Sequence, residues 1–308
     1  MLILVTGASG FIGSHVQAWL TTAGHEVIPA ARPAPARTGY VPFEPQSAAF
    51  IAALRRGPDV LIHAAGTSLV GESFNNPPED FRDNTNLYID VLEGVRQHAP
   101  HCRVMLLSSA AVYGEPPAQP AAETTAIAPI SPYGYHKAMA EQLGEMYHAL
   151  FGLRTCAMRV FSAYGRGLRR QVIYDAVRML RDSHPGDPAV FRGTGLEARD
   201  FIHVEDIARG VVAVIEGGAW TGEAYNLASG TSTTIADLTA IVRSKLGGAA
   251  TTTFDGLPSR GHPLVWQADI TRMQQIGFSP SWSLERGIGD LIDHWAEDHG
   301  AENHGSTV

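Results

Sequence analysis

The sequence predicts an α/β protein with a doubly wound parallel sheet and a smaller mixed α/β region in its C-terminal part. Short apolar runs alternate with helical patterns through the N-terminal part of the chain, as in repeated strand–helix units. These runs are continuous rather than alternating, which is typical of strands buried on both faces. With 308 residues, 44% of them hydrophobic and 18% charged, the chain has an ordinary globular composition and can bury a large core.

The elements of this sheet follow from the apolar runs and their boundaries. One helical pattern extends from about Phe11 to Ala23, and another begins near Tyr133. Two proline-rich stretches, 29–45 and 115–132, are predicted as loops over the carboxyl edge of the sheet, where ligands bind in such folds. The predicted strands cover residues 2–6, 25–30, 59–63, 104–108 and 155–160.

The pattern becomes less regular after Tyr164, which divides the chain into two predicted domains. The sheet with its helices forms a Rossmann-type domain over residues 1–164, and the chain is expected to return to it at about 201–224. Residues 165–200 and 225–308 are predicted to form a smaller, mixed α/β domain.

Charge and composition argue against several classes of protein. The formal net charge of −8 disfavours a general nucleic-acid binder, which needs a basic surface. No apolar run approaches the roughly 18 residues of a membrane-spanning helix. Two cysteines, Cys102 and Cys156, without a CxxC motif favour the reducing cytoplasm over a disulfide-bonded protein. The histidines show no metal-ligand spacing, so no metal is expected.

A glycine-rich turn over Thr6–Gly13 joins the first strand to the first helix. Glycine permits a tight turn and lets the backbone approach a pyrophosphate closely, and the helix N-terminus then offers unpaired N–H groups. The position of the motif between a first strand and a first helix predicts a nicotinamide dinucleotide site. The residues expected to contact it are Gly7, Gly10, Phe11, Ile12 and Gly13.

The end of the second predicted strand distinguishes the two nicotinamide cofactors. An acidic residue there binds the adenosine ribose in proteins that use NAD. This chain has Ala31 at that position, followed by Arg32, so no carboxylate is available and a cation stands beside the gap. A 2′-phosphate needs such a cation, so the sequence favours NADP(H), with NAD(H) and a solvent-exposed Arg32 as the alternative.

A tyrosine and a lysine four residues apart suggest acid–base chemistry. Tyr133 and Lys137 would share one face of a helix. A neighbouring ammonium favours the phenolate, so we expect Lys137 to lower the pKa of Tyr133 enough for proton exchange near neutral pH. The pair Ser108 and Ser109 lies at the carboxyl end of a strand, where a serine can hydrogen-bond the reacting oxygen. Each feature alone also has a structural explanation, because YxxxK occurs by chance and strand-end serines often cap turns.

Together these segments resemble the extended short-chain dehydrogenase/reductase family, the nucleotide-sugar epimerases, dehydratases and reductases. The resemblance covers nearly the whole chain, and its markers occur in order. They are TGASGFIG (6–13), HAAGTSLVGES (63–73), DNTN (83–86), SSAAVYG (108–114), SPYGYHK (131–137), RVFSAYGRG (159–167), RDFIHVEDIA (199–208) and YNLASG (225–230).

The resemblance implies roles for individual residues. Ser109, Tyr133 and Lys137 would form the catalytic set, in which hydride moves between the cofactor and a sugar carbon, usually C4, while the tyrosine moves the proton. Lys137 would also hold the nicotinamide ribose. Arginines would grip the substrate diphosphate, which gives a purpose to the ten arginines between Arg154 and Arg209. The implied cofactor contacts are Ala64, Ala65, Gly66 and Asn84, and the implied substrate contacts are Ser68, Ser109, Ser162, Gln171, Arg199 and Arg260.

Departures from the family pattern narrow the reaction. The 4,6-dehydratases carry an acidic pair where this chain has Ala110 and Ala111, so 4,6-dehydration is not expected. The missing acidic residue at Ala31 favours an enzyme that exchanges NADPH in each turnover. We therefore predict a reductase of a nucleotide-linked 4-keto sugar, with a nucleotide-sugar 4-epimerase that holds NAD tightly as the alternative. A non-catalytic dinucleotide sensor is a third hypothesis. A homodimer through helices near 81–98 and 131–151 is also implied.

Overall fold

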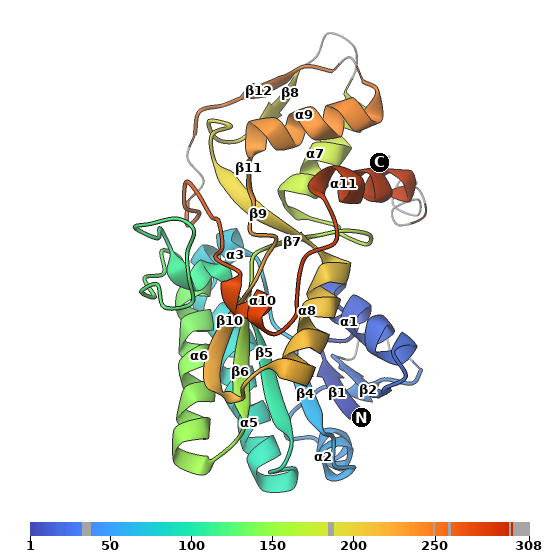
Figure 1. Ribbon diagram of the computed structural model, residues 1–308, viewed down its shortest axis with the longest axis vertical. Helices are drawn as coiled ribbons and strands as arrows, with labels where there is room; N and C mark the ends of the chain where they lie inside the picture. Colours follow the sequence, from blue (N-terminus) through green and yellow to red (C-terminus); the bar gives the residue numbers. More distant parts are fainter. Residues whose placement is uncertain (33–37, 184–187, 249, 258–259, 296, 298–308) are drawn as a thin grey trace.

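The computed structural model describes residues 1–32, 38–183, 188–248, 250–257, 260–295 and 297, which form two lobes stacked along the long axis of the molecule (Figure 1). The larger lobe is built on a seven-stranded sheet in which every neighbouring pair of strands is parallel. Its strand order is β10-β6-β5-β4-β1-β2-β3. The strands are β1 (Leu2–Thr6), β2 (Glu26–Ala31), β3 (Val41–Pro42), β4 (Val60–His63), β5 (Arg103–Ser109), β6 (Thr155–Val160) and β10 (Thr221–Leu227).

The strand order reverses between β1 and β4. From β1 the chain builds outward through β2 and β3, and it then crosses back to place β4, β5 and β6 on the other side. Loops from the two directions separate at this switch point, which leaves a crevice at the carboxyl ends of β1 and β4 where ligands bind in open α/β sheets. The doubly wound parallel sheet that the sequence predicts is thus confirmed.

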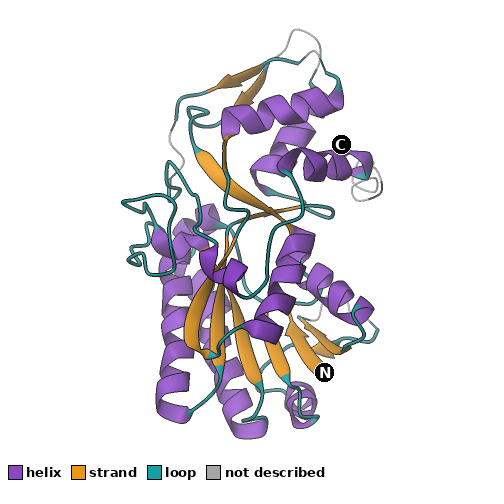
Figure 2. Cartoon of the chain, viewed as in Figure 1, coloured by secondary structure: helices purple, strands orange, loops and turns teal. Residues whose placement is uncertain are grey.

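Helices cover both faces of the sheet (Figure 2). One face packs against α1 (Phe11–Thr22) and α8 (Val204–Gly217), whose apolar residues share a buried cluster with β1, β4, β5 and β6. The other face packs against α2 (Ala48–Arg55), α5 (Leu87–His98) and α6 (Pro132–Phe151), which form a second cluster. Burial on both faces explains the continuous apolar runs of the strands.

Short helical segments connect the strands near their carboxyl ends. Between β4 and α5 lie α3 (Val70–Asn75), α4 (Pro77–Phe81) and a π-helical turn, η1 (Arg82–Asn86). A 3₁₀ turn, η2 (Ala110–Tyr113), follows β5 directly. Isolated π-helical turns occur frequently at functional sites, and this one lies beside the crevice described above.

The smaller lobe is a mixed α/β unit, as the sequence predicts. A three-stranded sheet has the order β11-β9-β7, with one antiparallel and one parallel pair, and a second sheet pairs β12 with β8. Its helices share a buried cluster that is separate from the core of the larger lobe. The elements are β7 (Ser162–Tyr164), α7 (Gln171–Asp182), β8 (Ala189–Phe191), β9 (Ala198–His203), β11 (Ser232–Thr234), α9 (Ile235–Leu246), β12 (Thr252–Phe254) and α11 (Leu284–Asp293).

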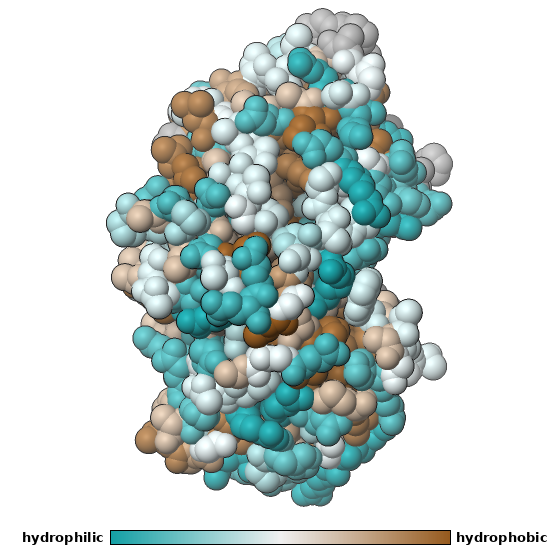
Figure 3. Space-filling view, viewed as in Figure 1, coloured by the Kyte–Doolittle hydropathy of each residue, from teal (hydrophilic) through white to brown (hydrophobic). Residues whose placement is uncertain are grey.

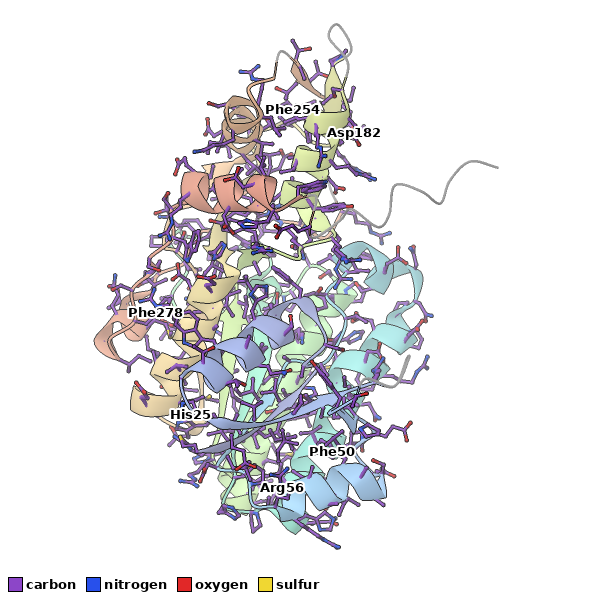
Figure 4. The ribbon with its side chains drawn as sticks, turned by 90° about the vertical axis from the view of Figure 1, so that its right-hand side faces the viewer. His25, Phe50, Arg56, Asp182, Phe254 and Phe278 are labelled. Carbon is purple, nitrogen blue, oxygen red and sulfur yellow. The ribbon has the colours of Figure 1, made fainter. Side chains whose placement is uncertain are left out.

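The chain returns to the larger lobe after β9. The predicted return at about 201–224 contains α8 and most of β10, which extends to Leu227. A further short helix, α10 (Thr271–Gln275), also packs against α8 and β10, because Met273 and Phe278 complete the apolar cluster there. Figure 4 shows Phe278 at the level of the larger lobe, far from Phe254 at the end of the smaller one. No helix within the described ranges is long and apolar enough to cross a membrane.

Candidate active site

The turn after β1 is shaped so that backbone, not side chains, faces the crevice. Gly7 has a φ of +69°, and a Cβ there would lie 2.6 Å from backbone atoms of Ala64 and Ala65. A Cβ on Gly13 would lie 2.1 Å from the Gly7 carbonyl oxygen, so α1 packs directly on the turn. No side chain caps α1 and no acidic residue occupies its first turn. The free N–H groups and the helix dipole therefore fit an anionic group such as a pyrophosphate.

The loop after β4 lies against this turn. Gly66 has a φ of +138°, and a Cβ there would lie 2.7 Å from Oδ1 of Asn84. The side-chain nitrogen of Asn84 donates to Thr67 and to the backbone and side chain of Asp80. Asn84 is buried behind the loop rather than in the crevice, so its contact with Gly66 shapes the cofactor-facing backbone.

Local sequence brings Ser109, Tyr133 and Lys137 together. The Ser131 side chain caps α6 and Pro132 occupies its first turn, which fixes where the helix begins. A Cβ on Gly134 would lie 2.5 Å from the carbonyl oxygen of Ala111, so α6 packs directly on η2. This contact sets Tyr133 beside Ser109, with which it shares a side-chain hydrogen bond.

Lys137 lies one helical turn after Tyr133. Its Nζ is 5.9 Å from the centre of the Tyr133 ring and donates a hydrogen bond of 3.1 Å to the carbonyl oxygen of Leu107. The structure thus places a phenol, a hydroxyl and an ammonium at the carboxyl end of β5, next to the glycine-rich turn.

Burial, more than charge, sets the protonation of these groups. Burial raises the pKa of Tyr133 to about 12, although the hydrogen bond with Ser109 lowers it. Burial also lowers the pKa of Lys137 to about 8, while the charges of Asp80 and Glu141 raise it. The expected fall in the pKa of Tyr133 is therefore not found, because desolvation outweighs any attraction from the ammonium. Near neutral pH Tyr133 is a phenol and most Lys137 is charged.

A cavity of about 1580 Å³ extends from the glycine-rich turn, past Tyr133, into the smaller lobe. It exceeds the roughly 300–1,000 Å³ of a typical small-molecule site, so it has room for more than one ligand. Most of the predicted site residues line it: Gly10, Phe11, Ile12, Gly13, Ala64, Gly66, Ser68, Ser109, Tyr133, Lys137, Ser162, Gln171 and Arg199. Those that lie outside its lining are Gly7, Arg32, Ala65, Asn84 and Arg260.

Arg32 is already paired with a carboxylate. Two of its guanidinium nitrogens donate to Asp83 at 2.7 and 3.2 Å, and 55% of the side chain is exposed. The prediction of a 2′-phosphate contact assumed that Arg32 has no carboxylate beside it, because Ala31 occupies the position of the usual acidic residue. In the structure the start of η1 brings Asp83 to that cation, so a phosphate there would have to displace the carboxylate.

The predicted substrate contacts differ in their surroundings. Arg199 is buried, donates to the carbonyl oxygens of Ala198 and Leu264, and lies 5.3 Å from the Trp266 ring centre. Burial lowers its pKa to about 10. Its hydrogen bonds within the described residues are to neutral carbonyls, and the charges of Glu197 and Glu115 also act on it and raise its pKa. Arg260 instead lies over the Phe74 ring at 4.1 Å, on the exposed surface.

Two other predicted contacts lie where the cavity passes between the lobes. Ser68 accepts a hydrogen bond of 3.0 Å from Arg170. Gln171 has a φ of +75°, which is rare for any residue other than glycine and costs about 1–3 kcal/mol. Backbone strain of this kind clusters at ligand sites, and here it turns the chain into α7 at the cavity wall.

Sequence reasoning missed several residues of the cavity wall. Arg170, Arg178 and Arg192 line it, and so does His262, whose pKa is lowered to about 4 by burial and by Arg199. The run of arginines was the one available signal, but it did not show which of them face inward. The side chains at Ala110 and Ala111 are buried methyl groups that cannot transfer a proton. The described residues hold no cluster of three or more potential metal ligands.

The chain is similar over nearly its whole length to known proteins. A putative UDP-glucose 4-epimerase of Methanocaldococcus jannaschii is 29% identical, over 97% of this chain and 99% of that protein. The solved structure of MoeE5 in complex with UDP-glucuronic acid and NAD has a TM-score of 0.86 at 27% identity, over 96% of this chain and 99% of that one. The dTDP-glucose 4,6-dehydratase DesIV from Streptomyces venezuelae, with NAD bound, has a TM-score of 0.85 at 26% identity, over 98% of both chains.

The family itself is settled by a match to most of the chain. The model of the NAD dependent epimerase/dehydratase family matches residues 3–228, which include the glycine-rich turn, both segments of the catalytic set and β10. This agrees with the family resemblance of the sequence motifs and with the sheet order observed here. The chain belongs to the NAD dependent epimerase/dehydratase family of enzymes.

Proposed function

We propose that this protein is a nucleotide-sugar 4-epimerase that keeps NAD bound through its catalytic cycle. The observation that carries this proposal is the placement of Tyr133, Ser109 and Lys137 between the glycine-rich turn and an arginine-lined cavity. Relatives named as UDP-glucose and UDP-glucuronate 4-epimerases support it. A UDP-linked hexose or hexuronate is the substrate that we propose.

Each catalytic side chain has a defined task in this reaction. The glycine-rich turn and Lys137 would hold NAD, which would supply a reversible hydride acceptor for sugar C4. In its phenolate form, which the positive charges of Lys137 and of bound oxidised NAD would favour over the phenol of the ligand-free protein, Tyr133 takes the proton of the 4-hydroxyl as the C4–H bond breaks and the C4=O bond forms. It returns the proton in the reverse step. Ser109 donates a hydrogen bond to the same oxygen. The Lys137 ammonium stabilises the phenolate by charge attraction.

The diphosphate of the substrate needs cations that lie beyond the reacting carbon. Arg199 is a buried cation whose hydrogen bonds within the described residues are to carbonyl oxygens. Arg178 and Arg192 also line the cavity. Guanidinium groups bind phosphate oxygens with directed, charge-assisted hydrogen bonds, so we propose Arg199 as the main diphosphate contact.

We propose an epimerase in preference to a reductase because Arg32, the cation that a 2′-phosphate of NADP(H) would need, is paired with Asp83. The related structures are described with NAD. An enzyme that recycles one NAD within each turnover does not need to exchange NADPH, so NAD is the cofactor that we propose.

An acidic sugar is favoured by Arg170. Its guanidinium donates to Ser68 and its charge acts on Tyr133, so it lies near the position of sugar C4. The carboxylate of a hexuronate is attached to the neighbouring carbon, C5. UDP-glucuronate is therefore expected to be converted faster than UDP-glucose, and Arg170→Met is expected to remove that preference.

The test is incubation of the purified protein with UDP-glucose and with UDP-glucuronate, followed by NMR of the sugar protons. We expect each substrate to convert to its C4 epimer without a net change in NADH absorbance. Stoichiometric consumption of NADPH with a 4-keto sugar would instead establish the reductase. Tight NAD binding with no turnover of any nucleotide sugar would support the sensor.

The compartment that we propose is the cytoplasm. Cys102 and Cys156 are both buried free thiols, and burial raises the pKa of each above its ordinary value. Neither forms a disulfide, which suits a reducing environment. Cell fractionation of the host organism, with detection of the protein by antibody, tests this proposal.

A further inference from the structure

A buried carboxylate outside the catalytic set lies close behind it. Asp80, in α4, has 5% of its surface exposed and accepts hydrogen bonds from three side chains. Nδ1 of His136 lies 2.5 Å from one oxygen, while Thr67 at 2.8 Å and Asn84 at 3.1 Å donate to the other. A buried carboxylate is costly unless it is hydrogen-bonded in this way.

The donors to Asp80 come from segments that hold the two halves of the active site. His136 is on α6, immediately before Lys137, and Thr67 immediately follows Gly66 in the loop after β4. The hydroxyl of Thr85 in η1 also donates to the backbone oxygen of His136 at 2.9 Å. One carboxylate therefore ties the catalytic helix to the cofactor-facing loop.

The charge of Asp80 also affects the pKa values of Lys137 and Tyr133. Its charge raises the pKa of Lys137, which burial lowers, and it raises the pKa of Tyr133 as well. Glu141 also faces Lys137, but its carboxylate is bonded to the Arg159 guanidinium at 2.7 Å and so is largely compensated.

The other titratable groups that face Tyr133 and Lys137 do not supply the negative charge that Asp80 supplies. His63, on β4, faces Lys137, and its pKa is lowered to about 3 mainly by burial, so it is neutral at working pH. Arg170 faces Tyr133 as a second cation. Asp80, with its partner His136, is thus the main source of negative charge for the Lys137 ammonium among the described residues.

We propose that Asp80 is a positioning residue of the epimerase reaction, which fixes α6 against the loop that carries Gly66 and keeps Lys137 charged. This inference rests on the proposed function for its catalytic meaning. The effect of the Asp80 charge on the pKa of Lys137 does not depend on the identity of the substrate.

The composition of the chain offers a direct measurement. The sequence contains two lysines, Lys137 and Lys245, and the second is exposed at the end of α9. Protein labelled with isotopic lysine should therefore give two side-chain NMR signals, whose positions report each ammonium during a pH titration. We expect Lys137 to titrate near pH 8 in the wild type, and Lys245 serves as the internal reference.

The decisive variant is Asp80→Asn, which keeps the side-chain shape and removes the charge. We expect the Lys137 midpoint to fall by about one pH unit, the scale on which a nearby charge acts, while Lys245 is unchanged. Asp80→Ser, measured in parallel, provides a second neutral variant so that the result does not depend on one of them folding. Asp80→Glu should restore most of the wild-type midpoint.

Glu79→Gln is the matched control, because it removes an exposed carboxylate from the adjacent position in α4. It should leave the Lys137 midpoint unchanged. An unchanged midpoint in folded Asp80→Asn, or an equal shift in Glu79→Gln, would overturn the inference. If the midpoint shifts but wild-type protein converts no nucleotide sugar, the proposed function fails and the charge effect stands.

The epimerase assay then tests the catalytic part. The alkaline limb of the kcat profile should move to lower pH in Asp80→Asn by the same amount as the NMR midpoint, with KM little changed. A purely structural role would lower kcat at every pH and leave the limb in place, which would contradict the proposal.

Discussion

Tyr133 performs its proposed chemistry from a buried site, where desolvation favours the phenol. The pKa of about 12 describes the protein without ligands, and the phenol is the form that can donate a proton to a sugar oxygen. Epimerisation needs the same oxygen to accept and return that proton, so the phenolic hydroxyl at this position is indispensable to the proposed reaction.

Removing this hydroxyl is the first prediction. Tyr133→Phe keeps the ring packing beside Ser109 but leaves no group to carry the proton, so kcat is expected to fall by about 10²–10⁴-fold. Epimer formation measured by NMR checks this, with NAD content measured on the same sample. Turnover near the wild-type rate would show that another group moves the proton.

The glycine-rich turn gives a second prediction with an internal control. Gly7→Ala would place a methyl group 2.6 Å from the backbone of Ala64 and Ala65 at a positive φ, so bound NAD is expected to be lost. Gly24 also has a positive φ, of +83°, but nothing lies within 4 Å of a Cβ there. Gly24→Ala should therefore cost only about 1–2 kcal/mol of stability and retain NAD.

Calorimetric NAD binding and urea unfolding of the two variants separate backbone strain from loss of the site. Similar NAD affinity in both would mean that the close approach at Gly7 has no role in binding.

The sequence could indicate the candidate catalytic residues, which the structure brings together, because their signals are local. Tyr133 and Lys137 are fixed by helical spacing, and Ser109 by the end of a strand. Asp80 could not be found in the same way, because its partners come from three segments that only the tertiary structure brings together. The pKa of Tyr133 was misjudged for a similar reason, since burial is a property of the fold.

At the scale of elements, a buried ion pair joins α6 to β6. Arg159 donates three hydrogen bonds to Glu141 through two nitrogens, and the Ser108 hydroxyl donates to the same carboxylate at 2.5 Å. Both charged side chains are almost fully buried. The pair holds α6 against the centre of the sheet. Each of the two buried charges is compensated by the other.

Breaking this pair is the third prediction. Glu141→Gln leaves the Arg159 guanidinium buried without its counter-charge, so the free energy of unfolding is expected to fall by about 3–5 kcal/mol. The control is Glu93→Gln, which breaks an exposed pair with Arg96 and should cost about 1 kcal/mol or less. Urea unfolding measures both. Equal losses would mean that the buried pair adds no more than an exposed one.

Strands and helices with a clear pattern of apolar residues could be predicted from the sequence. Elements that form only through contacts with distant segments could not. The strands β1, β4, β5 and β6 follow from continuous apolar runs. In contrast, β3 has two residues, and it exists because Val41 pairs with Ala30 at the edge of the sheet. The turn of η1 also carries no sequence signal, yet it places Asp83 against Arg32, which the prediction of a 2′-phosphate contact did not include.

At the scale of the whole molecule, α6 presents an apolar stripe to solvent. Tyr135, Met139 and Leu150 are exposed, and Leu150 has 70% of its surface exposed, while Leu143 and Met146 between them are partly buried against the core of the larger lobe. Apolar surface is visible at the lower left of Figure 3, where Figure 1 shows the end of α6. Exposed apolar side chains in a row fit an interaction surface, and on this ground we propose a homodimer through α5 and α6.

The fourth prediction is that charge on this stripe separates the subunits. The wild type should have a mass near twice 33.0 kDa, and the double substitution Met139→Glu with Leu150→Glu should reduce it to 33.0 kDa. Leu196→Glu, at a side chain of the smaller lobe that is 69% exposed, is the control and should leave the mass unchanged. Light scattering measures all three, and a monomeric wild type would refute the dimer.

The two lobes are joined by several passages of the backbone. The chain crosses between them after β6 at Phe161, from β9 into α8 at Val204, and from β10 to β11 over residues 228–231. Two lobes joined by one segment can rotate about it as a hinge. Several connecting segments restrict that rotation, because turning one lobe would strain all of them together. We therefore expect the width of the cavity between the lobes to stay nearly constant when a ligand binds. Selection of the ligand would then depend on its size, and side chains at the cavity entrance would make the remaining adjustments.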